Sequence, residues 1–332
     1  MNRNKSFFKK LFVFLLLAVA INLLLNTVYD HWMYYFRLNR NQDSQYEAFS
    51  DTLKYLMLGN SHNIVVPEIL GNSFSYVTPR ELYPQTYYKF RYILEHGRKK
   101  PAHILISIDP LNFGPKAESD LTFDGYWRKY LDYAELIRDT GDPGYILNWV
   151  TGNFFAYVGN FKFIFHSILY LNFDFSQIKN GYFPRRNYRN FGQEPNRDAQ
   201  GLEKATAYLA SYNKKSTLGA ERYYGRILDL CTQYDVRPIL LRMPLTDEYL
   251  KQANKMVDIE KLDRDIIDFT RQHNSHFKIF DFRNEFHGKP EYFFNADHVN
   301  PIGAAIITKK IKDELQKPVD QGVSEVSPAQ GK

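Results

Sequence analysis

An apolar run near the amino terminus constrains this 332-residue chain more than any other feature of its sequence. The run extends from Leu11 to Leu25 with one interruption at Asn22, and it continues to Val28. A helix of that length crosses the ~30 Å hydrocarbon core of a bilayer. Within that core only a helix or a closed barrel satisfies the backbone polar groups. The sequence therefore predicts a transmembrane helix within residues 1–30.

Charged and aromatic residues beside the run predict its orientation. Lys5, Lys9 and Lys10 precede it, and lysines favour the cytoplasmic side of a span. Residues 32–36 are mostly aromatic, as in the belts that mark a membrane interface. We therefore expect a single-pass protein of the cell membrane, with a polar tether at 31–50 and the rest of the chain outside the cytoplasm.

A cleavable signal peptide is the alternative to an anchor, because Ala18–Ala20 is compatible with a cleavage site. The run stays apolar through Ile21–Leu25, where a signal peptide would turn polar. We therefore favour an uncleaved anchor.

Beyond the tether, short apolar strands alternate with helical patterns, which is typical of a parallel α/β sheet. The predicted strands are Lys54–Leu58, Ser73–Val77, Ala102–Ile108, Arg237–Met243 and Lys278–Phe282. The clearest predicted helices are Pro84–His96, Ala220–Tyr234 and Pro301–Gln316. We expect a flavodoxin-like, three-layer α/β domain over 51–316 and a disordered polar tail at 317–332.

The alternation stops in the middle of the domain, where an aromatic-rich segment at about 115–200 predicts a helical insertion. Within it, Phe154–Leu171 contains Lys162 and His166 and is too interrupted for a second span. It packs against the core or lies on the bilayer. The basic, aromatic stretch Asn180–Arg197 either docks a polymer or is an ordinary solvated connection.

Charge and cysteine content limit the classes of partner and cofactor that we expect. The net charge is +6, yet the chain has no long block of lysine and arginine and no nucleic-acid motif. This fits a membrane surface or a polyanionic polymer, and we expect no nucleic-acid partner. Cys231 is the single cysteine, so no internal disulfide is possible, and no metal-ligand spacing accompanies it. We predict neither a cofactor nor a metal.

The stretch Gly59-Asn60-Ser61-His62 directly follows the first predicted strand. A turn of small residues after a buried strand presents its side chains at the carboxyl edge of a parallel sheet. Ser61 is therefore a candidate nucleophile, and the alternative is that it caps the next helix.

His298 lies between the last predicted strand and the final helix, in Asp297-His298-Val299-Asn300-Pro301-Ile302-Gly303. This segment can open at the same sheet edge as Ser61, although 237 positions separate the serine and the histidine (298 − 61). His62 is the alternative partner for Ser61.

These two blocks together resemble the SGNH (GDSL-type) hydrolase superfamily. The resemblance covers Leu53–Gln316 apart from the insertion. Within the superfamily, the chain is most similar to membrane-anchored extracytoplasmic members. These are the SGNH-like proteins of bacterial polysaccharide O-acetylation and the D-alanyl-transfer protein of teichoic-acid systems.

The resemblance implies that Ser61 is the nucleophile and His298 the general base. The superfamily usually has an aspartate three residues before the histidine, and this chain has Asn295 there. The acid is then Asp297, or Asn295 replaces it, or serine and histidine act as a dyad. We favour Asp297, although neighbouring side chains in an extended loop point apart, because a neutral amide does not stabilise an imidazolium by charge.

The superfamily also uses a glycine and an asparagine as oxyanion-hole donors. The chain has no clear equivalent of that glycine. We expect Asn60 and Asn112 to serve as oxyanion or substrate-binding residues. Arg242, at the end of the fourth strand, brings a cation toward the same edge.

The resulting expectation is a membrane-anchored serine esterase or O-acyltransferase that acts on a cell-envelope or exported polysaccharide through an acyl-serine. An integral-membrane acyltransferase is the partner that the resemblance implies. The alternative is a catalytically degenerate module that binds polysaccharide or such a partner. A metal-dependent hydrolase is a third reading, and Asp297 and His298 lack the further histidines in sequence that it would need.

Overall fold

The computed structural model describes most of the chain. The described residues are 2–32, 34–49, 52–79, 81–97, 99–108, 110–113, 127, 129–155, 175–182, 189–209, 219–274, 276–317 and 326–328. They belong to two compact units, one of Met1–Asp43 with Thr122–Phe175 and one of Ser44–Leu121 with Ser176–Lys332.

The first unit contains the long amino-terminal helix α1 (Asn2–Trp32). Its stretch Ser6–Tyr29 is long and apolar enough to cross a membrane, with a mean hydropathy of 2.5. Two shorter helices belong to the same unit, α6 (Tyr133–Thr140) and α7 (Gly144–Phe154). The structure thus shows the predicted apolar helix and helices in the insertion, whereas 156–171 of the apolar stretch lies outside the described residues.

The segment expected to be a polar tether is helical. It forms α2 (Tyr34–Ala48), because Leu38, Gln42 and Tyr46 recur every four residues and bury one face of the helix. The Tyr46 hydroxyl, near the end of α2, donates to the carbonyl of Lys99 at 3.0 Å. Both residues belong to the second unit, so this hydrogen bond lies within it.

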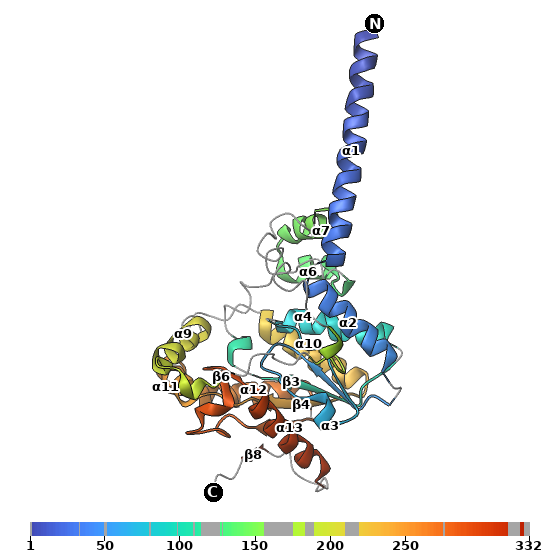
Figure 1. Cartoon of the computed structure of the whole chain (residues 1–332). Helices are drawn as coiled ribbons and strands as arrows, with labels where there is room; N and C mark the ends of the chain where they lie inside the picture. The colour runs from blue at the N-terminus through green and yellow to red at the C-terminus, as the bar shows by residue number, and fades with distance from the viewer. Residues whose placement is uncertain are drawn as a thin grey trace. The chain divides into compact units, whose positions relative to one another are not determined.

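A parallel sheet forms the centre of the second unit, with strand order β2-β1-β3-β4-β5-β8 (Figure 1). Its strands are β1 (Tyr55–Leu58), β2 (Ser73–Ser75), β3 (His103–Ser107), β4 (Arg237–Arg242), β5 (Lys278–Asp281) and β8 (Val326–Pro328). The predicted α/β class and its five strands are confirmed, and the order 2-1-3-4-5 is that of flavodoxin-like sheets. Three residues of the tail form β8, while 318–325 and 329–332 lie outside the described residues.

Helices cover both faces of this sheet. On one face α3 (Pro67–Leu70) packs against α13 (Pro301–Gln316), and on the other α4 (Tyr83–His96) packs against α10 (Gly219–Gln233) (Figure 1). Helix α12 (Ile259–His273) lies beside α10. With both faces covered, the central strands are apolar throughout, as all four buried residues of β1 show.

Aromatic side chains fill the contact between α4 and α10, which accounts for part of the tyrosine-rich composition. Tyr83 and Tyr224 have ring centroids 5.0 Å apart, and Tyr88 and Tyr223 are 5.8 Å apart. Such pairs add stability beyond the area that they bury.

The remaining elements of the second unit are short or peripheral. They are α9 (Arg197–Leu209), α11 (Asp247–Met256), a two-stranded sheet of β6 (Phe293–Asn295) and β7 (His298–Val299), and the 3-10 turns η1 (Pro110–Phe113), η4 (Phe191–Gln193) and η5 (Pro290–Tyr292). A further 3-10 turn, η3 (Phe175–Gln177), begins at the last residue of the first unit. Helices α9 and α11 pack on each other.

The order of the strands also predicts where a ligand binds. The chain moves from β1 to β2 in one direction across the sheet and from β3 to β4 in the other. Between β1 and β3 the connections diverge, and in sheets of this kind ligands bind beyond the carboxyl ends of the strands at such a point. The turn that carries Ser61 begins at this position.

His103 starts β3 at the opposite, amino-terminal edge of the sheet. Its ring stacks on Tyr55, with centroids 5.3 Å apart. Burial, followed by the charges of Arg237, Lys54 and Lys278, lowers the pKa of His103 from 6.5 to about 4.

This lowered pKa makes the stability of the fold depend on pH. Between pH 6.5 and about 4 the unfolded chain binds a proton that the folded chain refuses, so acidification through this window destabilises the fold. Glutamine binds no proton in this range. We therefore expect acidification through this window to lower the free energy of unfolding of His103→Gln by about 1–2 kcal/mol less than that of the wild type. Denaturant unfolding of the full chain in detergent, at both ends of the window, measures it. Wild type and variant with the same pH dependence would contradict the assignment.

Candidate active site

The turn after β1 is shaped by a glycine and held by side chains. Gly59 has φ +101°, a conformation that strains any residue with a Cβ. The Asn63 amide donates to the carbonyls of Leu58 and Leu105 at 3.0 and 2.8 Å, which fastens the turn to both β1 and β3. The turn therefore presents Ser61, half-buried, beyond the carboxyl ends of these two strands.

His298 is held by a small hairpin instead of a loop. Asn295 in β6 pairs with His298 in β7, and Ala296 and Asp297 form the turn between them. The hairpin passes directly into α13, whose first turn is capped by the side chain of Asn300. The imidazole is thus anchored by a strand pair on one side and a helix on the other.

Close packing explains the glycine that follows this cap. A Cβ on Gly303 would approach the carbonyl oxygen of Tyr292 to 2.6 Å, so the first turn of α13 can lie against η5 only with glycine here. Asn300 also donates to the carbonyl of Glu291 at 2.6 Å, which binds the same two segments together.

Ser61 and His298 meet across the 237 positions that separate them. The distance from Ser61 Oγ to His298 Nε2 is 2.9 Å. The other ring nitrogen, Nδ1, lies 3.1 Å from Asp297 Oδ1 and 3.1 Å from Asn295 Oδ1. Both are acceptor oxygens, so Nδ1 carries the proton, and Nε2 presents its lone pair to the serine hydroxyl.

The structure brings both sequence candidates for the third residue to the same nitrogen. Asp297 lies in the hairpin turn and not in extended backbone, so its carboxylate can fold back onto the next residue. Asn295 reaches Nδ1 from the opposite strand. Of the two, Asp297 alone supplies negative charge to stabilise an imidazolium.

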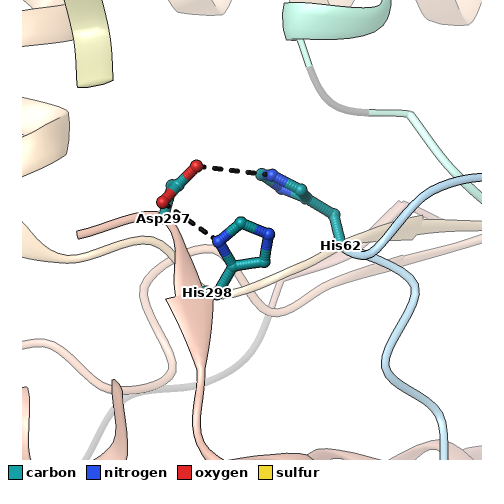
Figure 2. A group of neighbouring side chains, drawn as sticks. All are labelled: His62, Asp297 and His298. Atoms are coloured by element: carbon teal, nitrogen blue, oxygen red, sulfur yellow. Dashed lines mark hydrogen bonds and ion pairs between the residues drawn. The ribbon is translucent and has the colours of Figure 1, made fainter. Parts of the chain in front are cut away.

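A second histidine shares this carboxylate. Figure 2 shows Asp297 between two imidazoles, with Oδ1 directed at His298 and Oδ2 3.6 Å from His62 Nε2. The two rings are 4.5 Å apart between centroids. His62, the alternative partner of the serine by sequence, directs its ring at Asp297. Sequence spacing held no signal for this contact.

The two histidines keep Asp297 ionised. Burial alone would raise the pKa of this carboxyl, but the hydrogen bond from His298 and the close approach of His62 outweigh burial and hold the pKa well below its usual range. The site therefore contains a buried carboxylate that is held in its ionised form behind the imidazole that contacts Ser61.

The predicted oxyanion residues Asn60 and Asn112 are hydrogen-bonded to each other. Asn60 Nδ2 donates to Asn112 Oδ1 at 2.8 Å, and Asn112 Nδ2 donates to the Ser107 carbonyl at 3.4 Å. The backbone N–H of His62 donates to Asn60 Oδ1 at 3.0 Å. Each amide nitrogen thus has one partner among the described residues, and a primary amide has two N–H bonds.

Arg242 lies at the carboxyl edge of the sheet, as expected, and its charge is balanced by two acidic side chains. It ends β4, two strands away from β1, which puts it roughly 10 Å across the sheet. Its guanidinium binds Asp281 Oδ2 at 2.9 Å and Asp263 Oδ1 at 3.3 Å. Both acids belong to neighbouring elements, so the arginine braces β4 against β5 and α12, and we do not assign it to substrate.

Part of the basic stretch Asn180–Arg197 packs beside the hairpin. The Arg189 carbonyl accepts from Asn300 Nδ2 at 3.3 Å, and the Arg189 guanidinium lies 5.9 Å from the centre of the Phe294 ring. Residues 183–188 of this stretch lie outside the described part of the chain. The described part thus lies next to the strand pair that carries His298.

The triad region also holds the atoms of a possible metal site. His62, Asp297 and His298 each offer one ligand atom, and these atoms lie within 4.8 Å of one another. Two histidines and one carboxylate form the ligand set of some catalytic zinc sites.

Comparisons of the sequence with protein-family models and with curated proteins find no match.

The shared contact on Nδ1 predicts unequal roles for Asp297 and Asn295. We expect Asp297→Asn to slow covalent labelling of Ser61 by a fluorophosphonate by about 10²–10⁴-fold, because the imidazolium loses its counter-charge. Asn295→Ala should cost less than about 10-fold, because the lost bond is neutral. The measurement is the labelling rate of each variant relative to the wild type. Circular dichroism checks that the variants are folded as the wild type is.

A matched control is available at the surface. Asp247 Oδ1 lies 2.8 Å from His287 Nδ1, a histidine–aspartate pair like the one in the site but exposed. Asp247→Asn should label at the wild-type rate. A larger loss in Asn295→Ala than in Asp297→Asn would assign the orienting role to the amide.

Proposed function

We propose that this protein is a serine esterase or O-acyltransferase of the SGNH type. The observation that carries the proposal is the hydrogen-bonded series from Ser61 Oγ to His298 Nε2 and from His298 Nδ1 to Asp297. A serine, an imidazole of the right tautomer and an ionised carboxylate are the parts of an acyl-transfer site.

The reaction follows from these contacts. His298 Nε2 takes the proton of Ser61 while Oγ attacks an ester carbonyl, and the C–O bond to the leaving alcohol then breaks as His298 returns the proton to it. Water or a sugar hydroxyl, deprotonated by His298, attacks the acyl-serine and frees Ser61. Ionised Asp297 stabilises the imidazolium in both halves of the reaction.

The oxyanion of each tetrahedral intermediate needs donors at the mouth of the turn. The backbone N–H of Ser61 and the second N–H of Asn60 or Asn112 are our candidates. The hydrogen bond between the side chains of Asn60 and Asn112 supports this role, because it orients both amides before substrate arrives. Preorganised donors of this kind typically contribute about 10²–10³-fold to the rate each.

Two features support the SGNH assignment beyond the triad. The serine follows the first strand of a sheet ordered 2-1-3-4-5, and the histidine directly precedes the last helix. The resemblance of both sequence blocks to the superfamily agrees with this placement.

We further propose that the protein is anchored in the cell membrane by α1, with the active site outside the cytoplasm. The apolar length of Ser6–Tyr29 and the lysines before it support this topology. The acyl acceptor would be a cell-envelope or exported polysaccharide. Phe294, in the hairpin that carries His298, and Arg189, which lies over its ring, offer the aromatic ring and the cation that suit such a polymer. An integral-membrane acyltransferase is the proposed source of acyl groups.

A non-catalytic, polymer-binding module is the second candidate. Asn295 at the position of the usual aspartate and the absence of a second-block glycine favour it. Polymer binding and biological function that survive Ser61→Ala with His298→Ala would support this reading.

Activity-based labelling tests the proposal. We expect wild-type protein to react with a fluorophosphonate probe and to release nitrophenol from nitrophenyl acetate with formation of an acetyl-serine, found at Ser61 by mass spectrometry. Ser61→Ala should abolish both, and His298→Ala should slow both by about 10²–10⁴-fold, the usual contribution of a general base.

Two surface substitutions serve as controls. Ser44 is an exposed serine, and His287 is an exposed histidine bound to a carboxylate, so Ser44→Ala and His287→Ala should label as wild type does. Equal labelling of wild type and Ser61→Ala would overturn the proposal. Loss of activity on dialysis against EDTA, restored by Zn²⁺, would point to the metal reading of His62, Asp297 and His298.

A further inference from the structure

Helix α7 has an unusual combination of composition and exposure. Its sequence, Gly-Tyr-Ile-Leu-Asn-Trp-Val-Thr-Gly-Asn-Phe, contains no charged residue, yet none of its residues is buried. Outside α1, five of the seven exposed large hydrophobic side chains of the described residues lie at or just after this helix. They are Ile146, Leu147, Trp149, Phe154 and Phe155. Such a concentration marks an interaction surface.

The end of α7 is bound to the apolar helix α1. The Phe154 carbonyl, in the last turn of α7, accepts hydrogen bonds from Asn22 Nδ2 at 2.7 Å and from Asn26 Nδ2 at 2.5 Å. Figure 1 shows α7 beside the carboxyl-terminal part of α1. The contact lies within one compact unit, and Asn26 and Tyr29 are the two buried residues of α1 among those described.

This contact explains two polar residues in an otherwise apolar span. An amide inside the hydrocarbon is costly unless it is hydrogen-bonded, and so is a helix-terminal carbonyl. Asn22 and Asn26 are four residues apart and so project from one face of α1. Both costs are offset when the two amides meet the carbonyl of Phe154.

The position of the asparagines gives the depth of α7. They lie three and seven residues before Tyr29, the last residue of the apolar stretch. With a rise of 1.5 Å per residue, the Phe154 carbonyl lies roughly 5–10 Å inside the end of the span. Eleven residues make α7 about 16 Å long, too short to cross a ~30 Å core.

We propose that α7 is a second membrane-contacting element, embedded in the bilayer beside α1, and that phospholipid acyl chains cover its exposed apolar side chains. The inference rests on the proposed membrane anchor. Helix α6 contains charged residues, and the last charged residue before α7 is Asp142. This is the pattern expected where a chain passes from water into a bilayer. Trp149 and Tyr145 suit the interfacial depth.

Tryptophan quenching by brominated lipid tests the proposal on the full chain. The protein has three tryptophans, at positions 32, 127 and 149. A Trp32→Phe protein and a Trp32→Phe, Trp149→Phe protein are reconstituted into phosphatidylcholine vesicles with and without dibrominated acyl chains. The difference in emission between the two proteins is the emission of Trp149. Trp127 is buried and is kept in both proteins, so its emission cancels in the difference. We expect bromination to lower the Trp149 emission by about twofold or more.

A marker in α1 separates this proposal from the anchor on which it rests. Phe14, an exposed residue in the middle of the apolar stretch, becomes Trp in the protein that lacks Trp32 and Trp149. Quenching at position 14 without quenching of Trp149 overturns the embedding of α7 and leaves the anchor standing. Quenching at neither position overturns both.

Two further variants test the attachment. Asn22→Ala with Asn26→Ala should reduce the quenching of Trp149, and so should Leu147→Asp, which places a charge on the lipid-facing side. Leu202 is an exposed leucine of α9, so Leu202→Asp is the matched control and should leave the quenching unchanged. An equal effect of Leu147→Asp and Leu202→Asp would contradict a lipid-facing role for Leu147.

Discussion

An ionised carboxylate that is cut off from water must be compensated by its neighbours, and the site of this protein is arranged around that requirement at Asp297. Two imidazoles face its two oxygens, one from the turn after β1 and one from the β6–β7 hairpin. The carboxylate thereby joins the first strand of the sheet to the segment before the last helix. The contact of Ser61 with His298 depends on this junction, because the hairpin has to lie over the turn for both imidazoles to reach Asp297.

Much of the second unit was predictable because its signals are local. Uninterrupted apolar strands such as Leu56–Leu58 read as buried parallel strands, and the turn at Gly59 marks where β1 ends. Ser61 and His298 could be paired from sequence because both follow from the rule that ligands bind at the carboxyl ends of parallel strands. The helical tether was missed because Leu38, Gln42 and Tyr46 form a stripe of mixed polarity, which hydropathy does not reveal.

Other features depend on contacts that no spacing encodes. Arg242 ends a strand at the expected edge, but the partners that neutralise it, Asp263 and Asp281, come from elements whose packing is known only in three dimensions. The reach of His62 to Asp297 depends in the same way on where the hairpin docks. In the sequence, Asn22 is an unexplained polar residue within an apolar span. Its hydrogen bond to the Phe154 carbonyl explains why a polar residue is present there.

The separation of Ser61 and His298 in the sequence has a consequence for biosynthesis. The ribosome makes the serine 237 positions before the histidine, so a growing chain that contains Ser61 but not yet His298 lacks the contact between Ser61 Oγ and His298 Nε2. In such a chain the proposed nucleophile has no imidazole to take its proton. Under the proposed mechanism, acyl transfer can begin only after the β6–β7 hairpin has docked against the turn that carries Ser61.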